Sequence, residues 1–167
     1  MSLTLILTRH AKSSWQDPSL DDFDRPLNDR GRKSAGAVGT WLAGHDLVPG
    51  EVILSGARRT VDTWSLIAEH LEGAVAMHSD PALYHASAQS MLSVAQTGSA
   101  RTLMLIGHNP GIADFAARLV AEAPDHPQFD KYPTCATLVL GFEAKGWKDI
   151  GWGDGQVRHF VVPRELG

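Results

Sequence analysis

The stretch Leu3-Thr4-Leu5-Ile6-Leu7-Thr8-Arg9-His10-Ala11 determines how the rest of the chain is interpreted. Four of the five residues from 3 to 7 are large and apolar, which is typical of a β-strand covered on both faces of its sheet. Arg9 and His10 follow where such a strand leaves the sheet. Ligands of open α/β sheets bind outside the carboxyl ends of strands, so this pair predicts an anion site that contains a titratable nitrogen. For the dipeptide taken alone, two solvated polar residues are the commoner interpretation.

The length of the chain, 167 residues, predicts one domain over residues 1–167. Hydrophobic residues make up 43% of the sequence and charged residues 20%, which is enough for a hydrophobic core. The net charge of −4 disfavours nonspecific binding to nucleic acid or to an anionic membrane.

Cysteine content and hydropathy predict the compartment. The single cysteine, Cys135, excludes an internal disulfide and fits a reducing compartment. The N-terminus has neither the basic nor the long apolar region of a signal peptide. No apolar run approaches the roughly 18 residues of a membrane span. We therefore expect a cytoplasmic protein that needs no membrane.

Strand and helix patterns alternate along most of the chain. Short apolar runs predict strands, and apolar residues at spacings of three and four predict helices. The expected strands are 3–7, 52–54, 75–77, 102–106, 138–140 and 157–162, and the expected helices are 28–42, 57–71, 87–96 and 110–119. Asn28 and Asn109 are the expected N-caps of two helices, with Pro110 as the first helical residue. A turn at 151–155 would join the last two strands.

This order predicts an α/β fold with three layers: a mostly parallel central sheet, helices on both faces, and a C-terminal hairpin. The polar stretch after His10, which includes four aspartates between residues 17 and 24, is expected to be a long ordered loop over the strand ends.

Two further strands end in the same way as the first. Arg58 and Arg59 lie in the first turn of a helix, where cations oppose the helix dipole unless an anion is bound. Judged alone, two exposed arginines are an equally good interpretation. His108 follows the strong strand 102–106 and precedes a helix.

Parallel strands would bring Arg9, His10, Arg59 and His108 to one edge of the sheet. Two guanidinium groups suit a phosphate, because their planar donors match its oxygens and stay charged. A neutral imidazole can attack phosphorus, and a second imidazole can donate a hydrogen bond as negative charge builds up on the oxygens.

Three stretches resemble the signatures of the histidine phosphatase superfamily, which includes phosphoglycerate mutases, acid phosphatases and SixA-type phosphohistidine phosphatases. They are Leu7-Thr8-Arg9-His10-Ala11, the segment 55–63, and Gly107-His108-Asn109-Pro110-Gly111. The segment 9–15, followed by Asp24-Arg25-Pro26-Leu27-Asn28 and Arg30-Gly31, is most similar to the SixA-type branch. These motifs occur in the family's order and cover residues 3 to about 119.

The resemblance implies a covalent phosphohistidine at His10, with Arg9, Arg59 and His108 forming the phosphate pocket. It implies no metal ion or cofactor. The implied partner is a protein carrying phosphohistidine or a small phosphorylated substrate. The family pattern places the second arginine four residues after a serine and four before a threonine, so Ser55 and Thr63 select Arg59 over Arg58.

The sequence departs from the family at two points. Gly56-Ala57 stands where many members have a proline-containing pair, which we expect to alter only the turn. The glutamate that many members use as a general acid has no match. Nearby acidic or polar candidates fit no motif, and none is assigned; they are Asp17, Asp21, Asp22, Asp24, Tyr84 and His85.

Other functions stay open at this point. The nearest are a small-molecule phosphatase and a mutase-like phosphotransferase, although the chain is short for a mutase. A phospho-ligand binding module without turnover is a different class, and the presence of both histidines argues against it. A metal site built from His10, His85 and His108 is disfavoured by the two arginines and by the lack of a metal-binding motif.

Overall fold

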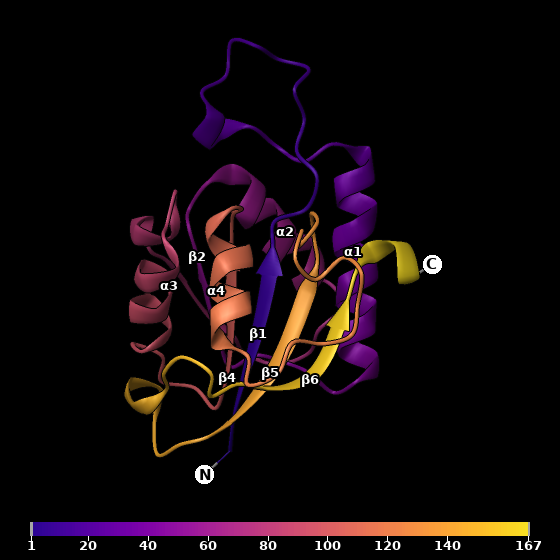
Figure 1. The fold of residues 1–167 in the computed structure, drawn as a ribbon. Helices are drawn as coiled ribbons and strands as arrows, with labels where there is room; N and C mark the ends of the chain where they lie inside the picture. Colours follow the sequence, from indigo (N-terminus) through magenta and orange to yellow (C-terminus); the bar gives the residue numbers. More distant parts are fainter. Residues whose placement is uncertain (1, 167) are drawn as a thin grey trace.

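The computed structural model describes residues 2–166, which form one six-stranded sheet with helices on both faces (Figure 1). The strands run in the order β3-β2-β4-β1-β5-β6. Their bounds are β1 Ser2–Arg9, β2 Glu51–Leu54, β3 Ala76–Ser79, β4 Thr102–Gly107, β5 Thr137–Glu143 and β6 Gln156–Val161. The helices are α1 Asp29–Gly44, α2 Arg58–Ala68, α3 Ala88–Ala95 and α4 Gly111–Leu119.

The sheet is mostly parallel, as predicted. Parallel pairing joins β3, β2, β4 and β1, and only β5 runs against its neighbours β1 and β6. The β5–β6 pair is the expected hairpin, but residues 144–155 connect its strands by a longer path than a tight turn at 151–155. That connection contains a short 3₁₀ helix, Trp147–Asp149, and its Gly155 exchanges backbone hydrogen bonds with the end of α4.

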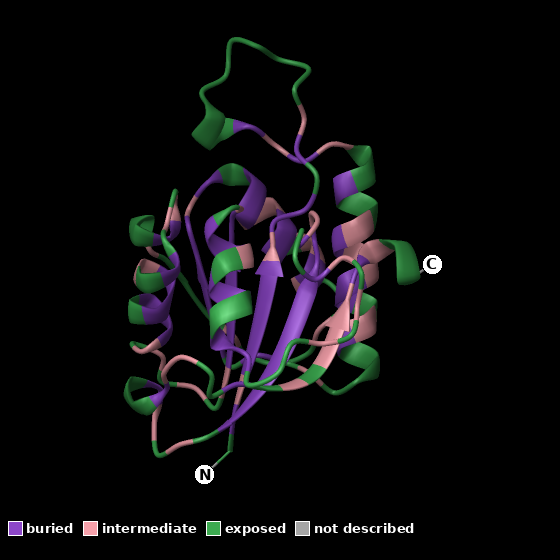
Figure 2. Cartoon of the chain, viewed as in Figure 1, coloured by how far each residue is buried: buried purple, intermediate pink, exposed green. Residues whose placement is uncertain are grey.

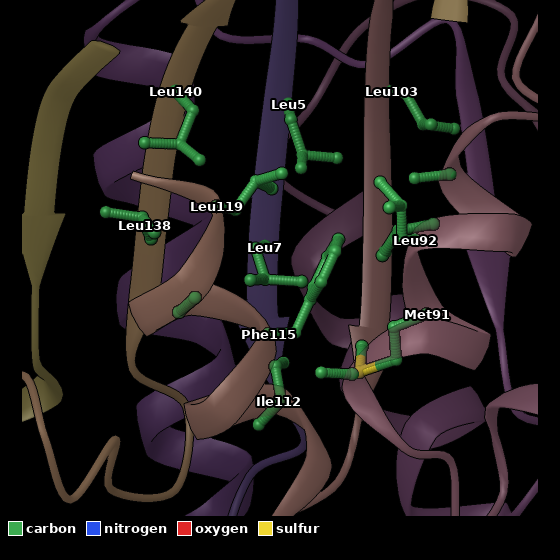
Figure 3. Close-up of a cluster of buried hydrophobic side chains, with 14 of the residues drawn as sticks. Leu5, Leu7, Met91, Leu92, Leu103, Ile112, Phe115, Leu119, Leu138 and Leu140 are labelled. Atoms are coloured by element: carbon green, nitrogen blue, oxygen red, sulfur yellow. The ribbon is translucent and has the colours of Figure 1, made fainter. Parts of the chain in front are cut away.

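Side chains of β1 alternate between two cores, as the two-residue period of a strand requires. Leu5 and Leu7 pack with α3 and α4, in contact with Phe115 of α4 (Figure 3). Ile6 faces the opposite way, into the core beneath α1 and α2. Leu5, Ile6 and Leu7 have no exposed surface, and Figure 2 shows most of the length of the central strands as buried. β1 is therefore the covered strand that its apolar run predicts.

The ends of two helices test the capping predictions in opposite ways. Asn28 is the N-cap of α1, and its side chain accepts a hydrogen bond from the Gly31 amide at 2.8 Å. The prediction of Asn109 as an N-cap is wrong: α4 begins at Gly111 after Pro110, which already has helical backbone angles. The Asn109 amide instead donates to the carbonyl groups of Lys131 and Tyr132. A contact across more than twenty residues has replaced the local cap.

The loop of residues 12–28 rises above the carboxyl ends of the parallel strands (Figure 1). It contains a short 3₁₀ helix, Asp22–Asp24, and its stem is joined by an isolated bridge between Ser13 and Leu27. No helix within residues 2–166 has the length and apolar character needed to cross a membrane.

Candidate active site

The three strand ends singled out in the sequence meet at one edge of the sheet. Arg9 lies opposite Gly107 in the β1–β4 pairing, and Leu54 lies opposite Ile106 in the β2–β4 pairing. A cavity of about 400 Å³ opens at this edge, and we call it the catalytic cavity. Its lining residues are Arg9, His10, Lys12, Ser13, Trp15, Asp22, Arg25, Arg59, His85, His108, Asn109 and Thr134.

His10 is buried at the rim of β1 and leaves one ring nitrogen unprotonated. Its Nδ1 lies 2.7 Å from the carbonyl oxygen of Ala11, which can only accept, so Nδ1 carries the proton and donates. Burial lowers the pKa of His10 to about 3; the bond to the Ala11 carbonyl opposes this shift, and His108 and the two arginines add to it. At neutral pH the imidazole is therefore neutral, with a lone pair on Nε2.

His108 is held from both sides. Its Nδ1 lies 3.3 Å from Nη2 of Arg59, and a guanidinium can only donate, so Nδ1 accepts. Its Nε2 therefore carries the proton and donates to Oγ of Ser55 at 2.7 Å. Burial and then Arg59 lower the pKa of His108 to about 4. The rings of His10 and His108 are 5.1 Å apart between centroids, so two neutral imidazoles face the same cavity.

These two histidines make the stability of the protein depend on pH. Their pKa values of about 3 and about 4 lie below the ordinary 6.5, so the unfolded chain binds more protons as the pH falls below about 6.5. The free energy of unfolding is therefore unaffected by these histidines above pH 6.5. As the pH falls from 6.5 toward the pKa of the folded state, each histidine lowers the free energy of unfolding by up to about 1.4 kcal/mol per pH unit. Denaturant unfolding between pH 7 and pH 4.5 should show this loss.

The double variant His10→Gln/His108→Gln is the matched control for that experiment. It is expected to have a shallower dependence of the free energy of unfolding on pH over the same range. An unchanged slope would mean that the two imidazoles are not kept neutral by the fold.

Ser55 sets the orientation of His108. Its Oγ accepts from His108 and from the Ala57 amide, which leaves its own proton for Oγ1 of Thr60, 3.3 Å away. Thr60 in turn donates to the carbonyl oxygen of Ala57. In the sequence motif, Ser55 serves only to identify which arginine belongs to the pocket. The structure adds that Ser55 contacts His108 and positions its ring, which the motif did not reveal.

Arg9 and Arg59 both line the cavity. Arg59 is 5% exposed, and the Nε atoms of both arginines are buried without a hydrogen-bond partner among residues 2–166. Burial and the charge of Arg59 lower the pKa of Arg9. Two guanidinium groups lining one cavity form a site suited to an anion with several oxygens, and such an anion would replace the carbonyl and carboxylate of Asp22 that Arg59 binds in this structure.

Arg58 and Arg59 point to different environments. The Arg58 side chain is 58% exposed and pairs with Asp62 on the same helix face at 3.5 Å. Thr63 links Arg59 to the β1 end, because its Oγ1 donates to the Arg59 carbonyl and accepts from the Ala11 amide. Of the two arginines, only Arg59 lines the catalytic cavity.

Asp22 of the loop reaches into this arrangement. Its carboxylate accepts from Arg59 at 3.0 Å, from the Tyr84 hydroxyl and from Arg25. The bond from Tyr84, aided by the two arginines, holds the pKa of Asp22 well below its ordinary value. Burial and Asp22 raise the pKa of Tyr84. The carboxylate is thus ionised and has no proton to donate, whereas the phenol keeps its proton.

Arg25 is one of the cavity residues that could not be assigned from the sequence. Its guanidinium is buried, donates to Oγ of Ser13 at 2.8 Å, pairs with Asp22 at 3.1 Å and lies 3.5 Å from the centre of the Trp15 ring. The signal was present in the stretch Asp24-Arg25-Pro26, but only as a mark of resemblance. Its position shows that it fixes the loop against the cavity.

Two glycines permit close approaches of the chain beside the site. A Cβ atom at Gly31 would lie 2.1 Å from the Lys12 carbonyl oxygen, and one at Gly111 would lie 2.0 Å from that of Ala86. A side chain at Gly31 would push α1 away from the segment that follows His10, and one at Gly111 would push the start of α4 away from the segment that precedes α3.

Metal-binding groups are not assembled in the part of the chain that the structure describes: no three His, Cys, Asp or Glu side chains within residues 2–166 are grouped to hold an ion.

Comparison with known proteins agrees with the geometry. The chain is 31% identical to an uncharacterized chloroplast protein of Arabidopsis thaliana, over 98% of this chain and 79% of that protein. Among solved structures, a protein named as a SixA phosphohistidine phosphatase from Nakamurella multipartitia has a TM-score of 0.80 at 24% identity, covering 98% of this chain and 97% of that one. Its counterpart from Agrobacterium tumefaciens has a TM-score of 0.76 at 25% identity, covering 96% and 98%.

The family model for the histidine phosphatase superfamily (branch 1) matches residues 5–89, a range that begins in β1 and ends in α3. The match therefore includes three of the four residues predicted from the strand ends, and His108 joins them in space from β4. With an arginine and a histidine after β1, a buried arginine in α2 and a second histidine after β4, this chain belongs to the histidine phosphatase superfamily.

Proposed function

We propose that residues 1–167 form one phosphatase domain that acts through a covalent phosphohistidine at His10 and removes phosphate from phosphohistidine on proteins. One observation supports this most: His10 presents an unprotonated Nε2 in a cavity that Arg9 and Arg59 also line. The name of the Agrobacterium tumefaciens structure, a SixA phosphohistidine phosphatase, supports the choice of substrate.

In the first step, the Nε2 lone pair of His10 forms a bond to phosphorus, and the leaving group departs with the electrons of its own bond. Arg9 and Arg59 hold the phosphoryl oxygens throughout. A bound dianion raises the pKa of His108. When Nη2 of Arg59 turns from Nδ1 of His108 to a phosphoryl oxygen, Nδ1 can take up a proton from solvent and donate to another oxygen, while Nε2 keeps its bond to Ser55. In the second step, water attacks phosphorus, releases phosphate and returns His10 to its neutral form.

The leaving group determines which substrates suit this site. An alkoxide leaves poorly without a proton, so alkyl phosphates need a general acid that contributes about 10²–10⁴ in rate. Asp22 is ionised, and the Tyr84 proton is already donated to it. A phosphorylated imidazole that is protonated on its other nitrogen releases neutral imidazole, and an aryl phosphate releases a phenolate; both depart easily without a general acid. We therefore propose that the protein prefers phosphohistidine and aryl phosphates over sugar phosphates and has no dedicated general acid.

The surroundings of the cavity favour a protein as the substrate. Trp15 is 75% exposed and Phe23 39% exposed on the loop beside the cavity, and exposed apolar groups at a site often contact a macromolecule. The proposal requires neither nucleic acid nor membrane. We place the protein in the cytoplasm, a reducing compartment in which the fully buried thiol of Cys135 stays unpaired.

A substrate panel tests this proposal. We expect kcat/KM to be highest for a phosphohistidine protein, lower for an aryl phosphate and lowest for 3-phosphoglycerate. Alanine variants of the four loop aspartates serve as controls for a hidden acid; they are Asp17, Asp21, Asp22 and Asp24. A preference for 3-phosphoglycerate that one of these variants abolishes would contradict both the acid-free site and the protein substrate.

A further inference from the structure

A second cavity adjoins the catalytic cavity. Its volume is about 320 Å³, and we call it the basic groove. Lys12 and Thr134 line both cavities, so the two spaces are neighbours along one surface. α1 forms one side of the groove, and the C-terminal 3₁₀ helix Pro163–Glu165, which lies against α1 in Figure 1, forms the other.

All the charged residues that line the groove are cations. Lys12, Arg30, Lys33 and Arg164 line it, and no aspartate or glutamate does. None of these four cations forms an ion pair or a side-chain hydrogen bond with another residue in the range 2–166.

The nearest carboxylates in sequence already have other partners. Asp29, next to Arg30, pairs with Arg32, and Glu165, next to Arg164, is 3.0 Å from His126. In a chain of net charge −4, four cations around one groove that have no ion-pair partner among residues 2–166 form a local site for an anionic ligand.

Between the charges the lining is partly apolar and partly polar, the polar residues being Ser34, Gln128 and Thr134. Ala37, Pro133, Val162 and Pro163 contribute to the lining. A site that combines four separate cations with apolar and neutral polar side chains matches a chain with several carboxylates and intervening methylene groups better than it matches a single compact phosphate. Glutamate and aspartate side chains of a polypeptide have this chemistry.

We infer that the basic groove binds an acidic segment of the protein substrate while the phosphohistidine of that substrate lies in the catalytic cavity. This inference rests on the proposed function and adds a recognition element to it. The shared wall at Lys12 and Thr134 lets one ligand occupy both cavities. The exposed Trp15 and Phe23 on the loop give the same substrate an apolar contact beside the site.

Binding without turnover provides the first test. An unphosphorylated glutamate-rich peptide is titrated into the full-length protein at low ionic strength, using fluorescence anisotropy. We expect the double variant Arg30→Glu/Lys33→Glu to bind it about 10-fold more weakly or worse, and the wild-type affinity to fall as salt is added.

The control variant is Arg101→Glu/Lys148→Glu. It changes the net charge equally but lies at the opposite end of the sheet, where Trp147 donates to the carbonyl oxygen of Ala100. We expect its affinity to stay within about twofold of wild type. Equal weakening in both variants, or no binding of the peptide to wild type, would refute the inference that the basic groove binds an acidic segment. Binding of tripolyphosphate without binding of the peptide would refute the acidic-segment proposal in favour of a small polyanion.

A turnover measurement forms the second test. The ratio of kcat/KM for a phosphohistidine peptide with flanking glutamates to that for one with flanking glutamines should exceed 1 in wild type. It should fall about 10-fold in Arg30→Glu/Lys33→Glu and stay unchanged in the control variant. An unchanged ratio in the groove variant would refute the inference. Because the peptide titration needs no turnover, a protein that binds the acidic peptide but does not hydrolyse phosphohistidine would refute the proposed function alone.

Discussion

Replacing His10 with alanine is expected to lower kcat for an aryl phosphate by at least about 10⁴-fold. The variant loses the Nε2 lone pair that forms the covalent bond. Among the described residues of the catalytic cavity, only His10 has a neutral ring whose Nδ1 is held by a backbone carbonyl, which leaves Nε2 free to attack. Steady-state kinetics on purified wild type and variant measure the loss.

Stability must be separated from chemistry in that comparison. His10 is 7% exposed, so alanine leaves a gap, and His10→Gln serves as a second variant that fills more of the space. Binding of vanadate, followed by protection against thermal unfolding, reports whether the arginine pocket survives. Full activity in either folded variant would end the proposal that His10 is the nucleophile.

The mechanism also uses no metal, so incubation with EDTA should leave turnover unchanged.

The second large effect is expected at Arg59. Arg59→Ala should cost roughly 2–4 kcal/mol in transition-state stabilisation, measured from kcat/KM, because a preorganised, charge-assisted donor to the transferring phosphoryl group is lost. Its buried side chain also lies 3.3 Å from Nδ1 of His108.

Arg58→Ala is the matched control for Arg59, one residue away on the same helix. Its side chain is 58% exposed and bound to Asp62, so we expect a change in kcat/KM of less than about 1 kcal/mol. Vanadate should protect wild-type Arg59 from chemical modification and leave Arg58 reactive. Equal losses in the two variants would show that the arginine has been assigned to the wrong position.

The elements that form the sheet edge could be predicted because their signals are local. The apolar run of β1, the strong strand β4 and the Asn28 cap each follow from residues within a few positions of one another. The spacing from Ser55 to Thr63 likewise selected the arginine that the structure places in the catalytic cavity.

The features that sequence reasoning missed depend on contacts between distant residues. Asp22 meets Arg59 across 37 positions, and nothing in an acidic loop indicates which of four aspartates will do so. Asn109 has the residue type of a helix cap, but its amide is used by carbonyl groups about twenty residues further on. The burial of Arg25 depends on Ser13 and Trp15, which the loop brings back over it. Local propensity cannot specify such loop closures.

The most direct test of the account is to trap the phosphorylated enzyme and locate the phosphate. The protein is mixed with a ³²P-labelled aryl phosphate, quenched in base during the first turnover and analysed by peptide mapping and ³¹P NMR. Because Nδ1 of His10 donates to the Ala11 carbonyl, we expect an acid-labile, base-stable phosphoramidate on Nε2 of His10. An acid-stable adduct, or a label on any residue other than His10, would contradict the account.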